Sequence, residues 1–208
     1  MTIKAVLFDM DGVLIEAKDW HYEALNDALS LFGMPISRFD HLTTFDGLPT
    51  RKKLEMLSLD RGLPRELHEF INEIKQMYTM NIVHTKCKPI FTHEKTLSTL
   101  KAMGLKLAVC SNSVRSSVEL MMKKANLDKY FDLMVSNEDV KKGKPDPEMY
   151  LKAMKEFKLK PDQCLILEDN ENGIKAAKAS GGHLLIINEI FDTNLENILV
   201  KIKKIQSK

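Results

Sequence analysis

Short apolar runs alternate with longer amphipathic stretches through most of this chain. The runs are five or six residues long and contain β-branched residues, which is typical of strands buried on both faces of a sheet: Ile3–Phe8, Leu105–Cys110, Phe131–Val135, Gln163–Leu167 and His183–Ile187. The stretches between them carry apolar residues at helical spacing and predict helices: Thr92–Met103, Ser113–Ala125, Asp146–Phe157 and Asn170–Ala179. This alternation predicts an α/β fold, a doubly wound, Rossmann-like parallel sheet with helices on both faces.

Polar residues mark where these helices begin. Asp146 precedes Pro147, a pair that predicts an N-cap followed by proline in the first helical position. Asn170 and Ser113 are predicted to cap the helices that follow them.

One long interval contains no convincing strand. Apolar residues recur at helical period over residues 17–32 and 67–82, and a shorter helix is predicted around Lys53–Leu59. We therefore expect residues 15–88 to form a helical module, inserted into an α/β core made of residues 1–14 and 89–208.

Composition narrows the class of protein. A chain of 208 residues buries roughly 70% of its unfolded surface, and a net charge of +2 is too balanced to indicate nucleic-acid binding. Three scattered cysteines indicate neither a disulfide framework nor a zinc site. No run approaches the roughly 18 apolar residues of a membrane span, and acids stand where a signal peptide would be apolar. We expect a cytoplasmic protein that acts on neither nucleic acid nor membranes.

Acidic pairs follow two of the predicted strands. Asp9 and Asp11 come directly after the first, and Glu168 and Asp169 after the fourth. The carboxyl ends of parallel strands line the ligand crevice of such a sheet, so these carboxylates should meet. Grouped carboxylates suit Mg²⁺, with Asp9 as a nucleophile and Asp11 as a proton carrier. The alternatives are an ordinary Asp-Gly turn at the first pair and acids favoured by a helix N-terminus at the second.

Two further residues point to phosphate. The hydroxyl of Ser111, with the N–H groups of the following helix, could hold a phosphate oxygen, although a simple helix cap is the alternative. Lys144 stands directly before Pro145 and a capped helix, so its ammonium should be held at the sheet edge. A fixed cation there would neutralise a phosphoryl oxygen and the nearby carboxylates.

Taken in order, these residues resemble the motifs of the haloacid dehalogenase superfamily, and more narrowly its phosphatase and β-phosphoglucomutase-like branch. The matching segments are VLFDMDGVL, AVCSNS, KKGKPDPE and LILEDNENGIKAA. The resemblance implies that the inserted helices are a cap domain. It also implies that Asp9 attacks phosphorus to form an aspartyl-phosphate, and that Asp11 protonates the leaving oxygen and then activates water. Ser111 and Lys144 correspond to phosphate-holding residues.

The resemblance also implies a magnesium cofactor and a set of substrate contacts. Asp169, helped by Glu168, corresponds to the metal carboxylate, with Asp9 and the backbone carbonyl of Asp11 completing the set. Contacts to the substrate are expected from His21, from Asn112, and from a cap loop that contains Gly47 and Arg51.

These inferences predict a monomeric, magnesium-dependent phosphatase that hydrolyses a small phosphorylated metabolite, such as a sugar phosphate. A β-phosphoglucomutase-type sugar phosphomutase is the alternative, although in that mutase the arginine corresponding to Arg51 stands one residue closer to the glycine. A non-catalytic phosphate- or magnesium-binding module is disfavoured, because every residue of the motif set is present.

Overall fold

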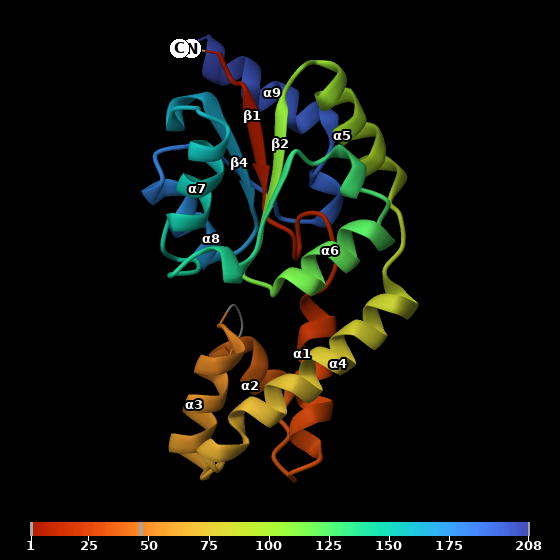
Figure 1. Cartoon of the computed structure of the whole chain (residues 1–208), viewed down its shortest axis with the longest axis vertical. Helices are drawn as coiled ribbons and strands as arrows, with labels where there is room; N and C mark the ends of the chain where they lie inside the picture. Colours follow the sequence, from red (N-terminus) through yellow and green to blue (C-terminus); the bar gives the residue numbers. More distant parts are fainter. Residues whose placement is uncertain (1, 46–47, 208) are drawn as a thin grey trace. The chain divides into compact units, whose positions relative to one another are not determined.

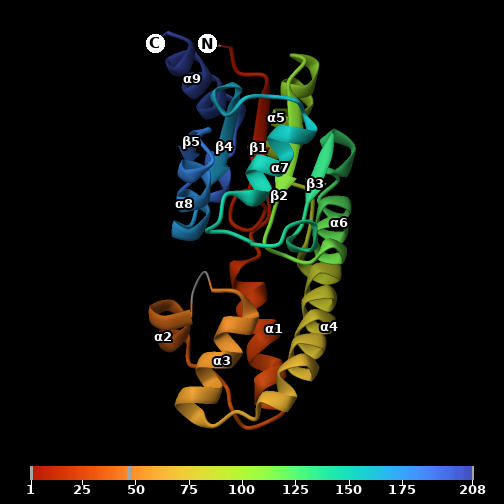
Figure 2. The ribbon, with the colours of Figure 1, turned by 60° about the vertical axis from the view of Figure 1, so that its left-hand side comes forward.

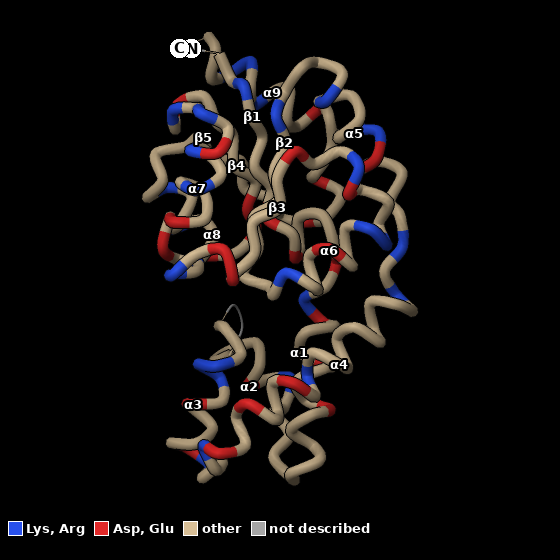
Figure 3. The backbone as a smooth tube through the Cα atoms, viewed as in Figure 1, with Lys and Arg blue, Asp and Glu red and all other residues tan. Residues whose placement is uncertain are grey.

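The computed structural model describes residues 2–45 and 48–207. It divides into two compact units, each described by itself: a core unit, Met1–Glu16 with Cys87–Lys208, and a helical unit, Ala17–Lys86 (Figure 1). Lysine and arginine are interspersed with aspartate and glutamate along the backbone of each unit (Figure 3), in agreement with the small net charge. Among the described residues, no helix combines the length and the apolar character that a membrane crossing requires.

A parallel sheet of five strands forms the centre of the core unit, and it confirms the predicted fold class. The strands are β1 (Ala5–Phe8), β2 (Lys106–Cys110), β3 (Leu133–Val135), β4 (Cys164–Glu168) and β5 (His183–Ile186). Their order is β3-β2-β1-β4-β5, and every neighbouring pair is parallel. Phe8 at the end of β1 pairs with Val109 on one side and Leu167 on the other. The residues that follow β1, β2 and β4 therefore emerge at the same edge.

Helices cover both faces of the sheet. They are α5 (Phe91–Ala102), α6 (Arg115–Lys124), α7 (Glu148–Glu156), α8 (Glu171–Ala179) and α9 (Leu195–Gln206). Helices α7 and α8 lie side by side on one face, and α5 and α9 pack together on the other (Figures 1 and 2). The first four correspond to predicted helices, whereas α9 was not predicted, although Ile198, Ile202 and Ile205 stand at helical spacing and are buried.

The start of α6 differs from the prediction. Ser113 does not cap this helix, because the first N–H, that of Arg115, donates instead to a carboxylate oxygen of Glu138 at 2.9 Å. Glu138 belongs to η4 (Asn137–Asp139), the turn that follows β3. The hydroxyl of Ser113 is thereby left to donate to Asp11 at 3.2 Å.

Of the other two predicted caps, Asn170 is confirmed, whereas Asp146 is not the N-cap residue of its helix. The side chain of Asn170 accepts a hydrogen bond from the N–H of Gly173 at 3.0 Å. Asp146 accepts from the N–H of Glu148 at 3.0 Å, but Pro147 precedes the first helical residue of α7 instead of forming it.

The helical unit has an apolar core of its own. Its elements are α1 (Lys18–Ser30), α2 (Arg38–Asp40), the π-helical turn η1 (His41–Phe45), α3 (Thr50–Arg61), the 3-10 turn η2 (Arg65–Leu67) and α4 (His68–Lys86). Helices α1 and α4 pack along one another, and Leu25, Leu29, Leu57 and Ile71 are almost completely buried among them. The predicted helices are present, with α3 and α4 longer than their apolar patterns because their ends are polar and exposed.

A polar network ties the loops that follow β2 and β3. The carboxylate of Asp139 accepts hydrogen bonds from the N–H and the hydroxyl of Ser136, both at 2.8 Å, and from the guanidinium of Arg115. Partial burial acts to raise the pKa of Asp139, but these hydrogen bonds outweigh it and lower the pKa to about 2. The ionised carboxylate therefore stabilises the folded state.

We expect Asp139→Asn to lower the free energy of unfolding at pH 7 by about 1–2 kcal/mol. Because its pKa is lowered, the carboxylate of Asp139 stabilises the fold at pH values above its ordinary pKa of 3.8. This contribution is lost as the pH falls toward 2. Urea unfolding followed by circular dichroism should show a gap between wild type and variant that narrows below about pH 4. The exposed Asp128 gives a control, Asp128→Asn, expected within about 0.5 kcal/mol of wild type. A gap of equal size at pH 7 and pH 3 would contradict this account.

Candidate active site

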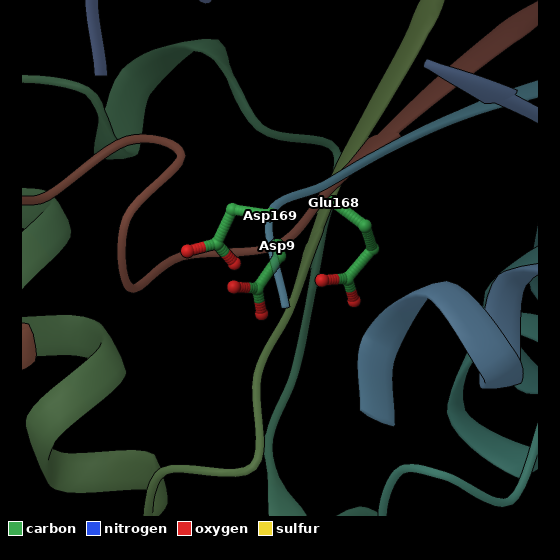
Figure 4. A group of neighbouring side chains, drawn as sticks. All are labelled: Asp9, Glu168 and Asp169. Carbon is green, nitrogen blue, oxygen red and sulfur yellow. The ribbon is translucent and has the colours of Figure 1, made fainter. Parts of the chain in front are cut away.

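Three carboxylates meet at the carboxyl edge of the sheet. Asp9 follows β1, Glu168 ends β4, and Asp169 comes next in the chain. One oxygen from each lies within 4.8 Å of the others, and Figure 4 shows the three side chains gathered where the two strands end. Asp9 is 5% exposed and Glu168 is fully buried. The predicted meeting of acids from two strands is therefore present in the structure.

A single buried ammonium bridges two of these acids. Nζ of Lys144 lies 2.5 Å from Oδ1 of Asp9, 2.6 Å from Oε1 of Glu168 and 2.8 Å from the carbonyl oxygen of Cys110. An ammonium has three N–H donors, and these contacts use all of them. Burial acts to lower the pKa of Lys144, but the facing carboxylates of Asp9 and Glu168 outweigh it and raise the pKa above its ordinary value. Lys144 is therefore a fixed cation.

One ammonium does not balance the acidic cluster. Burial raises the pKa of Asp9 well above its ordinary value; Lys144 opposes this, while Glu168, Asp11 and Asp169 add to it. A fully ionised cluster therefore calls for a second source of positive charge.

The donor set fits a magnesium ion. Carboxylate oxygens are the protein ligands that Mg²⁺ takes, usually one or two of them together with waters and phosphate oxygens. Oε2 of Glu168 is buried and has no hydrogen-bond partner among residues 2–45 and 48–207. The carboxylate of Asp11 does not belong to the group of three and instead accepts from Ser113. Its backbone carbonyl is the atom predicted as a ligand, and that assignment stays a prediction.

The side chain of Asn112 fixes the main chain at Lys144. Oδ1 of Asn112 accepts from the N–H of Lys144 at 2.9 Å, and Nδ2 donates to the carbonyl of Lys144 at 3.1 Å. Gly143 has to be glycine for this pairing, because a Cβ there would lie 2.6 Å from Oδ1 of Asn112. Asn112 was predicted to contact substrate; in the structure, both polar atoms of its side chain contact the loop that carries Lys144.

The two serines after β2 differ in their partners. Ser111 is 1% exposed, and its hydroxyl oxygen accepts from the N–H of Ser113 at 3.1 Å. The hydroxyl of Ser113 donates to Oδ2 of Asp11. The sequence reasoning missed this contact because it treated Ser113 as a helix cap.

Tyr150 of α7 is a further residue that the sequence reasoning missed. It is fully buried, and its hydroxyl donates to Oε1 of Glu168. The ring also lies against the ammonium of Lys144, with 5.1 Å between Nζ and the ring centroid. A tyrosine on the buried face of a predicted helix needs a partner for its hydroxyl, and that requirement was the available signal.

The predicted substrate contacts of the inserted segment lie in the helical unit. Nδ1 of His21 is 3.4 Å from Nζ of Lys75, in α4. The side chain of Arg51 is 88% exposed, and its Nε lies 3.4 Å from Glu55 one turn later in α3. Gly47 lies outside the described residues. The roles of these residues stay predictions.

The comparison with known proteins decides the family. A family model described as haloacid dehalogenase-like hydrolase matches residues 6–187. The chain belongs to this family. The hydrolase is 29% identical over 187 residues to a phosphorylated carbohydrates phosphatase from Thermotoga maritima, covering 86% of this chain and 82% of that protein. It is 32% identical over 180 residues to a phosphoglycolate phosphatase from Aquifex aeolicus, covering 86% and 82%.

Solved structures agree on the fold of the hydrolase. A β-phosphoglucomutase from Clostridium difficile matches with a TM-score of 0.84 and 20% identity over the whole of both chains. These findings confirm the predicted family, and the names of the curated relatives support the predicted class of enzyme, a phosphoric monoester hydrolase.

The charge balance around Lys144 gives a test without substrate. In the presence of a chelator at pH 7, we expect Lys144→Met to lower the free energy of unfolding by about 3–5 kcal/mol, because it leaves Asp9 and Glu168 buried without a cation. Asp169→Asn should not lower it, since the carboxylate of Asp169 repels that of Asp9. Chemical denaturation measures both effects.

The exposed neighbour Lys141 supplies the matched control, Lys141→Met, which should leave stability within about 0.5 kcal/mol of wild type. Equal losses for Lys144→Met and Asp169→Asn would show that packing, and not charge balance, sets the stability of the site.

Proposed function

We propose that this hydrolase is a magnesium-dependent phosphatase acting on a small phosphorylated metabolite, with a sugar phosphate as the leading candidate. The observation that carries the proposal is the buried ammonium of Lys144, which bridges Asp9 and Glu168. Phosphoryl transfer to a carboxylate brings two anions together and needs fixed positive charge at that point. The phosphatases from T. maritima and A. aeolicus support the same chemistry.

Asp9, Glu168 and Asp169 would hold the magnesium ion, with the backbone carbonyl of Asp11. When bound, the ion supplies positive charge to the carboxylates and to the phosphoryl oxygens.

Transfer proceeds through Asp9 and Asp11. A carboxylate oxygen of Asp9 attacks phosphorus, and the bond from phosphorus to the ester oxygen breaks as Asp11 gives that oxygen a proton. Asp11 then takes a proton from water, whose oxygen attacks phosphorus as the bond from phosphorus to the Asp9 oxygen breaks. Phosphate leaves, the Asp9 carboxylate is restored and Asp11 is protonated again. The hydrogen bond from Ser113 holds the carboxylate of Asp11 in place between these steps.

Lys144 and Ser111 hold the transferred group. Because all three donors of Lys144 already have acceptors, a phosphate oxygen replaces Oδ1 of Asp9 on the ammonium when the carboxylate attacks. When the phosphate oxygen replaces Oδ1 of Asp9, the ammonium of Lys144 stays paired with an anionic oxygen. It then faces the negative charge that develops on the phosphoryl group.

Selection of the leaving group falls to the helical segment, residues 15–88, which we assign as a cap. His21, Arg51 and the loop of Gly47 are its proposed substrate contacts. The phosphoryl group is the same in every phosphomonoester, so the part of the substrate that differs has to be recognised by residues other than those of the core site.

We expect the protein to hydrolyse p-nitrophenyl phosphate or a small sugar phosphate, and Asp9→Asn to lower kcat by at least about 1000-fold. A chelator should abolish turnover of the wild type, and added Mg²⁺ should restore it. Phosphate release measures the rate, and Asp128→Asn is the control that should retain activity. Turnover by Asp9→Asn at the wild-type rate would rule out Asp9 as the nucleophile.

A mutase is the second candidate, and the buried side chain of Lys75, whose Nζ lies 3.4 Å from Nδ1 of His21, favours it, since a mutase needs a cationic group for a second phosphate. The exposure of Arg51 and its contact with Glu55 favour the phosphatase.

With β-glucose 1-phosphate and catalytic glucose 1,6-bisphosphate, we expect ³¹P NMR to show free phosphate or no reaction, while other phosphomonoesters are cleaved. A mutase works by returning the bisphosphate in the opposite orientation, so glucose 6-phosphate forming much faster than free phosphate would reverse the assignment.

A further inference from the structure

Glu168 is a fully buried carboxylate at the end of β4, and three other elements fix its position. Lys144 contacts Oε1 from the loop before α7, and Tyr150 donates to the same oxygen from within α7. A buried carboxylate with two fixed partners on one oxygen has little rotational freedom left.

The hydroxyl of Tyr150 donates to Glu168, and no second partner for it is found among residues 2–45 and 48–207. Its ring packs in the apolar cluster under the sheet, with Leu7, Ile166 and Ala176 among its members, and the hydroxyl is the polar atom that this side chain brings to the site. A phenylalanine would fill the same apolar space. The hydrogen bond to Glu168 therefore accounts for a tyrosine, and not a phenylalanine, at position 150.

Gly173 limits Glu168 from the opposite side. A Cβ on Gly173 would lie 2.0 Å from Cδ and Oε2 of Glu168 and 2.1 Å from Oε1. The carboxylate thus occupies the space in which any other residue would carry its side chain. Gly173 lies in the first turn of α8, where the carboxamide of Asn170 holds its N–H at 3.0 Å. Because this cap fixes the backbone, a methyl group there has to displace Glu168.

We propose that Tyr150 and Gly173 are positioning residues that fix the carboxylate of Glu168 and, through it, the ammonium of Lys144. The inference rests on the proposed function for its effects on magnesium affinity and on catalysis, whereas its effect on stability is independent of that function. Neither residue needs to touch substrate: Tyr150 holds one oxygen of the carboxylate, and Gly173 leaves space for the whole group. Residues that hold a metal ligand without contacting the metal themselves typically change metal affinity or activity by about 10–100-fold when they are mutated.

The first experiment is a cycle of four full-length proteins: wild type, Gly173→Ala, Glu168→Ala and the double variant. The thermal midpoint is measured in the presence of a chelator. Gly173→Ala should lower the midpoint of the wild type, because the new methyl group overlaps the carboxylate. In the Glu168→Ala background the same change should have no effect or raise the midpoint, since the space is then empty and alanine suits a helix better than glycine.

The second experiment removes the hydroxyl of Tyr150 alone. Titration calorimetry with Mg²⁺ in the absence of substrate should show that Tyr150→Phe raises the dissociation constant for Mg²⁺ by about 10-fold. In the Glu168→Ala background the same change should alter it less than about twofold, because its partner is gone. With substrate, kcat should fall by about 10-fold with KM changed less than about twofold. Tyr130→Phe, in the turn η3 (Asp128–Tyr130), is the matched control and should behave as wild type.

Three results would overturn the inference. One is an equal loss of thermal midpoint for Gly173→Ala with and without Glu168. Another is unchanged magnesium affinity in Tyr150→Phe, and the third is a weakening of equal size in both backgrounds. Should the wild type hydrolyse no phosphomonoester, the proposed function fails, while the thermal cycle still decides whether Gly173 leaves the space that Glu168 occupies.

Discussion

The candidate site depends on one interaction, the pairing of the Lys144 ammonium with two buried carboxylates. The ammonium is buried between Asp9 and Glu168, and it takes the carbonyl of Cys110 as its third acceptor. Burial raises the pKa of Asp9, and the facing ammonium opposes this rise, so it favours the ionised carboxylate that the proposed attack on phosphorus requires. Asn112 and Gly143 fix the main chain that carries this cation. The site is therefore organised around one charge that both acids share.

The sheet order explains how that charge reaches both acids. Strand β1 lies between β2 and β4, so Asp9 emerges with Cys110 on one side and Glu168 on the other. The chain changes faces of the sheet after β3, and the strand order reverses at β1 and β4, the place where sheets of this kind bind their ligands. Lys144 comes from the crossover that joins β3 to β4. The fold thus brings one buried ammonium and the carboxylates of Asp9, Glu168 and Asp169 to a single point.

The sequence predicts those parts of the fold and of the candidate site that depend on the pattern of residues within one short segment. The strands follow from continuous apolar runs, and Asp9, Glu168 and Asp169 follow from their places at strand ends. The contacts of Tyr150 with Glu168 and of Asn112 with Lys144 join distant segments, so no local pattern contains them. The assignment of Ser113 as a helix cap was wrong for the same reason. The carboxylate of Glu138, which accepts from the first N–H of α6, comes from a turn after another strand and is not visible in the local pattern.

NMR of the lysine side-chain ¹⁵Nζ groups tests the central claim most directly, with Lys144→Met used to assign the signal. The account predicts that Lys144 stays an ammonium, with slowly exchanging protons, at pH values where exposed lysines begin to titrate. Burial alone would lower the pKa of Lys144, whereas its contacts with Asp9 and Glu168 raise it. A Lys144 signal that titrates below those of the exposed lysines, in folded protein, would contradict the account.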